Sequence, residues 1–262
     1  MPEGDTIWRA AAMLRPRLVG RRVLAARPPA LARLAGATVT AVDTTGKHLF
    51  VRFDSGLSLH THMRMTGVWQ VYAPGERWRR PERLARAVIE VEGTVAVLFS
   101  APLVELTRHD DHTAHLGPDI LAQDFDAGLV VRRARSLGDV PVGELLLDQR
   151  VTAGIGNIWR NEALWMQRVS PWRGSASLSD DELRALYEWV HSEMRRHLRG
   201  PARRSAVHGR GGRSCPRCAT PIRVRAQGAH ARLTYWCEGC QYQITGSSPE
   251  VPSGRRRASP RA

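Results

Sequence analysis

Lysine is almost absent from this chain of 262 residues. Lysine and arginine together number 39, but Lys47 is the only lysine. A genome rich in G and C favours arginine codons and would produce this imbalance without selection on chemistry. Because arginine stays protonated near neutral pH whereas an amine can exchange a proton, Lys47 is a candidate for a chemical role. Chance survival of one lysine is the alternative.

The sequence also lacks a long apolar segment. No apolar run approaches the roughly 18–20 residues that a membrane span needs, and the acidic start Met1-Pro2-Glu3-Gly4-Asp5 does not have the layout of a signal peptide. We therefore expect a cytoplasmic protein without a membrane partner, in which thiols stay reduced. No cysteine precedes Cys215, so no disulfide is expected elsewhere in the chain.

Negative charge is scarce. Only 25 residues are acidic, the formal net charge is +14, and the apolar share of 42% is that of a globular protein. Such a surplus of positive charge indicates a polyanionic partner, with nucleic acid ahead of a membrane. A location at the nucleoid follows from this expectation. A ribosome-associated or merely soluble basic protein is the alternative.

Short alternating segments dominate the first part of the chain. Helical spacing after Gly4, to about Arg17, predicts a helix with Asp5 or Thr6 as its N-cap. Period-two patterns then predict strands, with glycine-containing turns between them. These strands lie near 38–42, 48–53, 57–60, 87–91 and 95–99. Together they favour a β-sandwich or barrel over about the first 115 residues.

The pattern becomes helical after Pro118. Helix-type spacing occurs at 142–147, 157–166 and 180–198, the last with acidic residues in its first turn. The tail at 246–262 consists largely of Ser, Pro, Arg and Gly and cannot form a core. The expected domains are a β-sandwich at 1–117, a helical domain at 118–205, a zinc finger at 206–245 and a disordered tail at 246–262.

The four cysteines have metal-ligand spacing. They follow the pattern C-x2-C-x18-C-x2-C, and each pair supplies two thiolates from one tight turn. The sequence therefore predicts one structural zinc ion, with four ligands and no open position; iron in a rubredoxin-like site is the minor alternative. The run 232–236 suits a hairpin between the two pairs. The ligands are Cys215, Cys218, Cys237 and Cys240.

Two further segments suggest chemistry. Gly154-Ile155-Gly156-Asn157 can open a helix whose backbone N–H groups seat a phosphate, although a plain helical hairpin is the alternative. Removal of Met1 would expose Pro2 as a secondary amine. An α-amino group titrates near about 7.7–8.0 and can attack an aldehyde-like carbon. Glu3 would then stand beside it as a general acid.

Five motifs in one order resemble the formamidopyrimidine-DNA glycosylase / endonuclease VIII family. The resemblance extends to about Ile244 and implies an α+β multidomain protein. Its parts are an N-terminal β-sandwich with an N-terminal helix, a helix–two-turn–helix domain and a C-terminal zinc finger with four cysteine ligands. The motifs are Met1-Pro2-Glu3-Gly4-Asp5-Thr6, Thr45-Gly46-Lys47-His48-Leu49, Ala153-Gly154-Ile155-Gly156-Asn157, Asn161-Glu162-Ala163-Leu164, and Arg232 with Cys237, Cys240 and Gln241.

The resemblance implies a bifunctional DNA glycosylase and AP lyase that acts on damaged DNA as a monomer. Pro2 would attack C1′ of the lesion nucleotide and form a Schiff base, and Glu3 would donate a proton to the sugar. Lys47 would contact phosphate and assist β-elimination. Arg232 would grip the phosphates and serve δ-elimination, and Asn157 would be another phosphate ligand. A damaged base must leave the stack before an amine can reach its sugar.

The space vacated by a flipped base must be filled. The turn His62-Met63-Arg64-Met65 corresponds to the family's wedge segment, so Met65 is expected to insert and Arg64 to face the opposite strand. Unbranched Met suits an irregular gap. A core methionine in a strand is the alternative interpretation of Met65.

Several departures from the family pattern bear on the substrate. Ala101-Pro102-Leu103-Val104-Glu105-Leu106 stands where the formamidopyrimidine branch has Asp-Pro-Arg-Arg-Phe, which favours the endonuclease VIII branch and oxidised pyrimidines. Thr6 replaces a common glutamate, which leaves lesion handling in the pocket open. His115 lies near a position that is often arginine in endonuclease VIII, and it is a candidate DNA contact.

Histidines form two clusters in the sequence. His109-Asp110-Asp111-His112 resembles a metal-ligand cluster, and His60 and His62 have the spacing of ligands on one face of a strand. A solvated loop and a strand face explain them more simply, so no second metal site is predicted. Two rivals to the glycosylase remain: a non-enzymatic zinc-dependent DNA-binding protein, and a phosphodiesterase that works through the His/Asp cluster.

Overall fold

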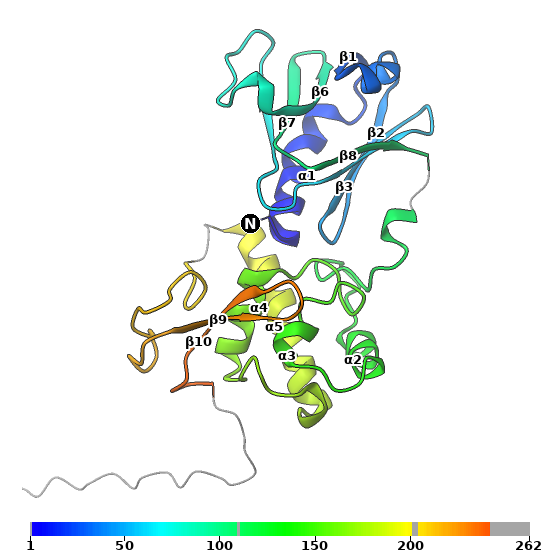
Figure 1. Ribbon diagram of the computed structural model, residues 1–262. Helices are drawn as coiled ribbons and strands as arrows, with labels where there is room; N and C mark the ends of the chain where they lie inside the picture. Colours follow the sequence, from blue (N-terminus) through cyan, green and yellow to red (C-terminus); the bar gives the residue numbers. More distant parts are fainter. Residues whose placement is uncertain (1, 109–110, 201–203, 242–262) are drawn as a thin grey trace, which may run out of the picture.

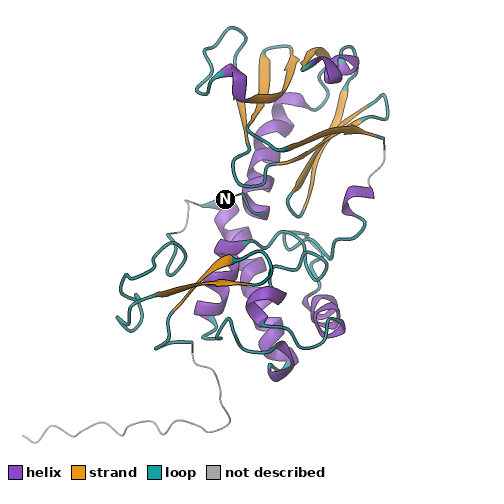
Figure 2. Ribbon diagram, in the orientation of Figure 1, coloured by secondary structure: helices purple, strands orange, loops and turns teal. Residues whose placement is uncertain are grey.

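Two lobes follow one another along the chain (Figure 1). The structure, a computed structural model, describes residues 2–108, 111–200 and 204–241. Figure 2 shows strands gathered around one long helix in the first lobe, and helices beside a β-hairpin in the second. The predicted α+β fold with its three parts is confirmed. The predicted tail at 246–262, together with His109 and Asp110, lies outside the described residues.

The first lobe is a β-sandwich of two antiparallel sheets. One sheet has the order β1-β6-β7-β5 and the other the order β2-β3-β4-β8. Two 3-10 helices, η1 (Pro29–Leu34) and η2 (Glu82–Leu84), lie in its connections. The strands are β1 (Val23–Arg27), β2 (Val39–Thr45), β3 (His48–Phe53), β4 (Ser58–His62), β5 (Val68–Tyr72), β6 (Ala85–Val91), β7 (Thr94–Phe99) and β8 (Leu103–Thr107).

Helix α1 (Gly4–Leu18) packs its apolar stripe into the sandwich core. Ile7, Ala11 and Leu14 recur at helical spacing and are buried together with core residues of the strands. The expected N-cap is wrong, because the N-cap is Glu3 and its side chain does not cap α1. Asp5 lies inside the helix, where its carboxylate accepts the Thr6 N–H at 2.9 Å. The Glu3 side chain is engaged by the other lobe, as described below.

The second lobe is helical. Its helices are α2 (Ala127–Ser136), α3 (Val142–Leu145), α4 (Asn157–Met166) and α5 (Asp180–Arg199), with the short helices η3 (Asp111–Thr113) before them and η4 (Ser175–Ser177) before α5. Their apolar faces form one core that includes Val130, Leu145, Ala163 and Leu186. The sequence predicted α4 with the observed bounds and α5 to within one residue, but it did not predict α2.

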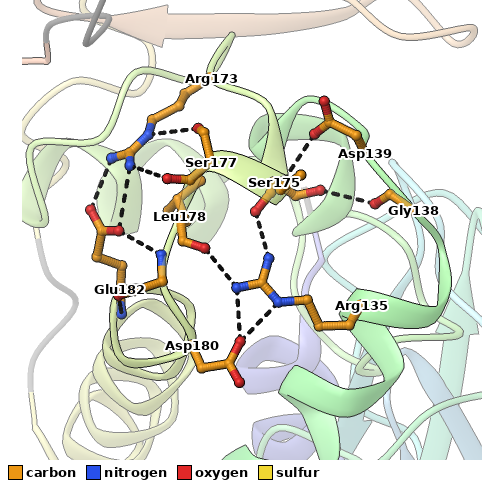
Figure 3. Close-up of polar contacts among 11 residues, drawn as sticks. Arg135, Gly138, Asp139, Arg173, Ser175, Ser177, Leu178, Asp180 and Glu182 are labelled. Carbon is orange, nitrogen blue, oxygen red and sulfur yellow. Dashed lines mark hydrogen bonds and ion pairs between the residues drawn. The ribbon is translucent and has the colours of Figure 1, made fainter. Parts of the chain in front are cut away.

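Two arginines fix the start of α5 (Figure 3). Arg135, at the end of α2, donates to the Asp180 carboxylate at 2.8 Å and to the carbonyls of Ser175 and Leu178. Arg173 donates to Glu182 at 2.9 Å, and Glu182 forms a capping box with Ser179. This network joins α2, η4 and α5.

A β-hairpin completes the second lobe. Strands β9 (Arg223–Gln227) and β10 (Arg232–Trp236) pair antiparallel and lie against α4. The hairpin at 232–236 was expected from the sequence, and the four cysteines gather at its base. None of the helices in the described part of the chain combines the length and apolarity of a membrane-spanning helix.

Candidate active site and nucleic-acid interface

Glu3 joins the two lobes. Glu3 is 1% exposed, and its carboxylate accepts backbone N–H groups of Gly156 at 3.0 Å, Ile158 at 2.7 Å and Trp159 at 3.3 Å. These groups belong to the first turn of α4, where the helix dipole favours an anion. Burial nevertheless raises the pKa of Glu3 to about 7, although the charge of Lys47 and the backbone hydrogen bonds lower it.

The turn before α4 fits closely around this carboxylate. A Cβ at Gly156 would lie 2.3 Å from the Glu3 carboxyl carbon, so only glycine leaves room there. The Gly4 N–H donates to the Gly154 carbonyl at 2.9 Å. Pro2, which precedes Glu3 and is half-buried, is therefore held beside the Gly-x-Gly turn. The sequence placed these residues in two separate motifs, and the structure brings them together.

Lys47 reaches the same turn from the first lobe. It lies in the β2–β3 hairpin, and its Nζ donates to the Ile155 carbonyl. Burial lowers the pKa of Lys47 to about 8; the charge of Glu3 raises it, and the charge of Arg232 lowers it. The single lysine thus contacts the turn that also holds Glu3 and carries an amine that titrates close to neutral pH.

Two side chains that the sequence analysis did not assign hold this arrangement. The Asp119 carboxylate accepts the Gly46 N–H at 2.7 Å and the Leu121 N–H at 2.8 Å. Gln149 accepts the Gly154 N–H at 3.0 Å and donates to the Ile155 carbonyl at 3.0 Å. Asp119 directly follows Pro118, after which the helical pattern begins, and Gln149 lies five residues before Gly154 of the Gly-x-Gly turn. Their partners are distant in sequence, so only that adjacency could have indicated them.

Asn157 and the hairpin meet at the other side of α4. The Asn157 side-chain nitrogen was expected to be a donor for phosphate, but here it donates to the Leu233 carbonyl at 2.8 Å. Buried Arg160 donates to the same carbonyl and to Thr234 Oγ1 at 2.8 Å. The exposed Arg232 begins β10, one residue before this anchor. Its charge acts on Lys47 and on Arg160, which places it near both.

The wedge candidates lie at the tip of the β4–β5 turn. Met65 is 57% exposed, whereas Met63 is 2% exposed and belongs to the core. The alternative interpretation of Met65 as a core methionine is therefore wrong. Arg64 is exposed in a left-handed backbone conformation with φ 44°. His115 is exposed in the segment that follows η3, between the strands and the helical lobe.

The four cysteine sulfurs form a compact cluster. Cys218 Sγ lies 3.3 Å from Cys237 Sγ and 3.3 Å from Cys240 Sγ, and Cys215 Sγ lies 3.9 Å from Cys240 Sγ. A tetrahedral zinc ion with Zn–S bonds of about 2.3 Å needs sulfur separations of about 3.8 Å. All four sulfurs lie within 4.8 Å of one another. The donor set thus fits a zinc ion at the base of the hairpin that carries Arg232.

Comparisons with known proteins match both lobes. A family model described as the formamidopyrimidine-DNA glycosylase N-terminal domain matches residues 1–102. A second, described as the formamidopyrimidine-DNA glycosylase H2TH domain, matches residues 116–206. Between them these two models cover most of the chain.

Curated relatives cover the chain almost completely. "Probable endonuclease 8 2" of Streptomyces coelicolor is 37% identical over 279 residues, covering 100% of both chains. "DNA-(apurinic or apyrimidinic site) lyase Nei2" of Mycolicibacterium smegmatis is 35% identical over 257 residues, covering 92% of this chain and 99% of that protein. The solved MutM (Fpg) protein of Thermus thermophilus has a TM-score of 0.77 at 28% identity, covering 95% of this chain and 100% of that one. The chain belongs to the formamidopyrimidine-DNA glycosylase family of DNA glycosylases and DNA lyases, and endonuclease 8 proteins are among its relatives.

Proposed function

We propose that this protein is a bifunctional DNA glycosylase and AP lyase that removes oxidised bases, mainly pyrimidines, through a Schiff base on Pro2. The observation that carries the proposal is the convergence at the α4 turn. Glu3 accepts three of its backbone N–H groups there, and the only lysine of the chain donates to the adjacent carbonyl. The nucleophile candidate, an acid and an amine thus meet at the N-terminus of α4, whose N–H groups at Gly156, Ile158 and Trp159 are occupied by the Glu3 carboxylate and not open to a phosphate.

The first step is displacement of the base. After removal of Met1, the unprotonated Pro2 nitrogen attacks C1′ of the flipped nucleotide and the bond between C1′ and the base breaks. The base leaves with the electron pair of that bond and takes up the proton that the Pro2 nitrogen loses. Glu3, in its protonated form, supplies a proton to the sugar ring oxygen as the ring opens. The product is an iminium between Pro2 and C1′. A carboxyl group with a pKa of about 7 is suited to donating this proton near neutral pH.

Strand cleavage follows by elimination. Loss of a C2′ proton from the iminium expels the 3′ phosphate, and Lys47 is proposed to assist this β-elimination. A second elimination expels the 5′ phosphate, for which we propose Arg232. Arginine remains charged throughout and binds phosphate with a planar fork. Asn157 is proposed as a further phosphate ligand, through exchange of its bond to the Leu233 carbonyl.

The zinc ion would have a structural role. The ligands Cys215, Cys218, Cys237 and Cys240 would hold it, and four thiolates leave no coordination position for substrate. Its contribution would be to fix the hairpin so that Arg232 projects toward the lobe interface. Every chemical step is therefore assigned to groups of the chain itself.

The proposed preference for oxidised pyrimidines rests on the assignment to the endonuclease VIII branch, and Met65 is the proposed wedge. Met65 is exposed at a turn tip, as an inserted apolar side chain requires. The segment 101–106 lacks the Asp-Pro-Arg-Arg-Phe pattern of the formamidopyrimidine branch. Relatives named endonuclease 8 agree with that branch assignment. Thr6 follows Asp5 at the start of α1, where the family often has glutamate, so lesion recognition there would involve different groups.

Borohydride trapping tests the proposal. Untagged mature protein, incubated with an oligonucleotide that carries an abasic site or an oxidised pyrimidine, should give one covalent adduct by intact mass. A matched protein with residues added before Pro2 should give none. Absence of an adduct from the mature protein would favour the non-enzymatic DNA-binding rival. Cleavage that survives the extension and is lost on chelation, without any adduct, would favour the phosphodiesterase.

A further inference from the structure

Histidines gather on the outer face of the sheet β2-β3-β4-β8. His48 and His62 are register partners on β3 and β4, and His60 on β4 is the partner of Glu105 on β8. Their neighbours along the strands, such as Leu49, point to the opposite face and join the core. His112 of η3 covers this outer face, with its ring 4.5 Å from that of His60. Residues far apart in the sequence thus converge on one patch.

Three ligand atoms of this patch face one another. His60 Nδ1 lies 3.5 Å from Glu105 Oε2, and His112 Nδ1 lies 3.6 Å from the same oxygen. Both separations exceed the usual 2.7–3.2 Å of an N–H···O hydrogen bond. Ligands of a tetrahedral ion with bonds of about 2.0–2.2 Å stand about 3.3–3.5 Å apart. The geometry is therefore closer to that of ligands sharing a cation than to that of a hydrogen-bonded pair.

The other ring nitrogen of His60 is positioned by His48. His48 Nδ1 lies 2.8 Å from His60 Nε2. In the tautomer in which His60 donates from Nε2 to His48 Nδ1, the lone pair of His60 lies on Nδ1, the nitrogen that faces Glu105. Metal-binding histidines are oriented by such a bond to their second nitrogen.

We infer that His60, Glu105 and His112 bind one divalent transition-metal ion, with zinc as the natural candidate, at a site separate from the four cysteines. Two imidazoles and one carboxylate are ligands that zinc accepts, and three protein ligands leave a fourth position for water or another ligand. His62 is outside the set, because its Nδ1 accepts the Arg64 N–H at 3.0 Å. The expectation from sequence that these histidines form only a solvated loop and a strand face is replaced by this inference.

Such an ion would attach the connection between the two lobes to the sheet of the first lobe. His112 belongs to the connection after β8, and this connection leads into the helical lobe. His60 and Glu105 belong to neighbouring strands of the sheet whose β2–β3 hairpin carries Lys47. Metal binding would therefore fix the start of the interlobe connection on the sheet whose β2–β3 hairpin carries Lys47.

Metal counting tests the inference without reference to activity. Full-length protein, with its cysteine site loaded by one equivalent of zinc, is dialysed against rising Zn²⁺ and the bound metal is measured. We expect two zinc ions per chain in the wild type and one in Glu105→Gln or His112→Ala. His230→Ala, which removes an exposed histidine of the β9–β10 turn, should still bind two. One ion in the wild type, or two in both ligand variants, would overturn the site.

Two further measurements guard against misfolding of the variants. His48→Phe keeps all three ligands but removes the partner of His60, so it should still bind two ions, with affinity for the second weakened by about 10–100-fold. In the zinc-loaded wild type, one added equivalent of Co²⁺ should give visible d–d bands without a thiolate charge-transfer band. A thiolate band from that equivalent, or equal affinity in His48→Phe and wild type, would contradict the assignment.

Discussion

Glu3 accepts hydrogen bonds from the α4 turn and is the proposed proton donor, and one substitution separates these two roles. Glu3→Gln keeps an oxygen to accept N–H groups of the α4 turn but removes the transferable proton. We expect excision of an oxidised pyrimidine to slow by about 10²–10⁴-fold, the usual contribution of a general acid. Trapping on a preformed abasic site should be affected less, because no base has to leave and part of the sugar is already open.

Single-turnover excision and borohydride trapping, measured on matched oligonucleotides, give the two rates. Glu92→Gln is the control, since Glu92 is an exposed carboxylate of the β6–β7 turn, with Arg21 3.8 Å away. It should leave both rates unchanged. Equal loss of excision and trapping in Glu3→Gln would assign Glu3 a positioning task alone.

The titration of Glu3 depends on Lys47. Burial raises the pKa of Glu3 from 4.5 to about 7, and the Lys47 charge opposes that rise. Carbon-13 NMR of the Glu3 carboxyl should therefore show a midpoint near 7 in the wild type and a higher one in Lys47→Met. Arg15→Met, which removes a cation bonded to the Val42 carbonyl instead, should leave the midpoint unchanged. A wild-type midpoint near 4.5 would contradict the raised pKa of Glu3.

The raised pKa of Glu3 also determines whether the free energy of unfolding rises or falls with pH. Between pH 4.5 and about 7 the folded protein retains the Glu3 proton that the unfolded chain has released. The contribution of Glu3 to the free energy of unfolding therefore falls as pH rises through this window. Denaturant titrations should show a flatter pH dependence in Glu3→Gln than in the wild type over that range. The Glu92→Gln control should follow the wild type, and an unchanged slope in Glu3→Gln would contradict the pKa.

At the scale of elements, the turn before α4 depends on a missing side chain. Gly156→Ala would place a Cβ 2.3 Å from the Glu3 carboxyl carbon, so the carboxylate must leave the N–H groups that hold it. Overpacking of this kind costs about 1–3 kcal/mol. Denaturant unfolding should report that loss, with excision falling as well. Gly200→Ala, whose new Cβ would have its nearest neighbour at 3.7 Å, should do neither; equal effects in both variants would refute the tight fit.

Elements were predictable where burial follows a simple period. Helix α4 carries apolar residues at helical spacing after a Gly-x-Gly turn, and its bounds were predicted from the sequence. Strand β1 lies among arginines and prolines, and its Leu24 is 64% exposed. In β8 no residue is fully buried, so its side chains do not alternate. Neither strand has a local signal in the sequence, because each depends on a partner strand that is distant in the sequence. Strand β1 pairs with β6, and β8 pairs with β4.

For the whole molecule, the parts were predictable but their contact was not. Cysteine spacing indicated the metal cluster, and motif order indicated two lobes. The interlobe bonds join residues far apart in the sequence, such as Glu3 with Gly156, Gly46 with Asp119 and Asp5 with His197 at 3.4 Å. No local pattern encodes such pairs. Asn157 illustrates the difference, since its position was expected at the turn but its bond to Leu233 depends on the docked hairpin.

The net charge of +14 leads to a prediction about the complete complex. If Lys47 and Arg232 seat phosphates across the lobe boundary, each neutralised phosphate contributes a slope of about −0.9 to the plot of log affinity against log salt. Arg232→Gln should make that slope about 0.9 less steep, measured by fluorescence anisotropy with abasic-site DNA. Arg83→Gln, which changes a residue of η2 in the first lobe, should keep the wild-type slope. Arg232 and Lys47 are close enough for one charge to lower the pKa of the other, so a polyanion placed between them removes this repulsion as well as adding attraction. An unchanged slope in Arg232→Gln would mean that the hairpin arginine does not bind phosphate.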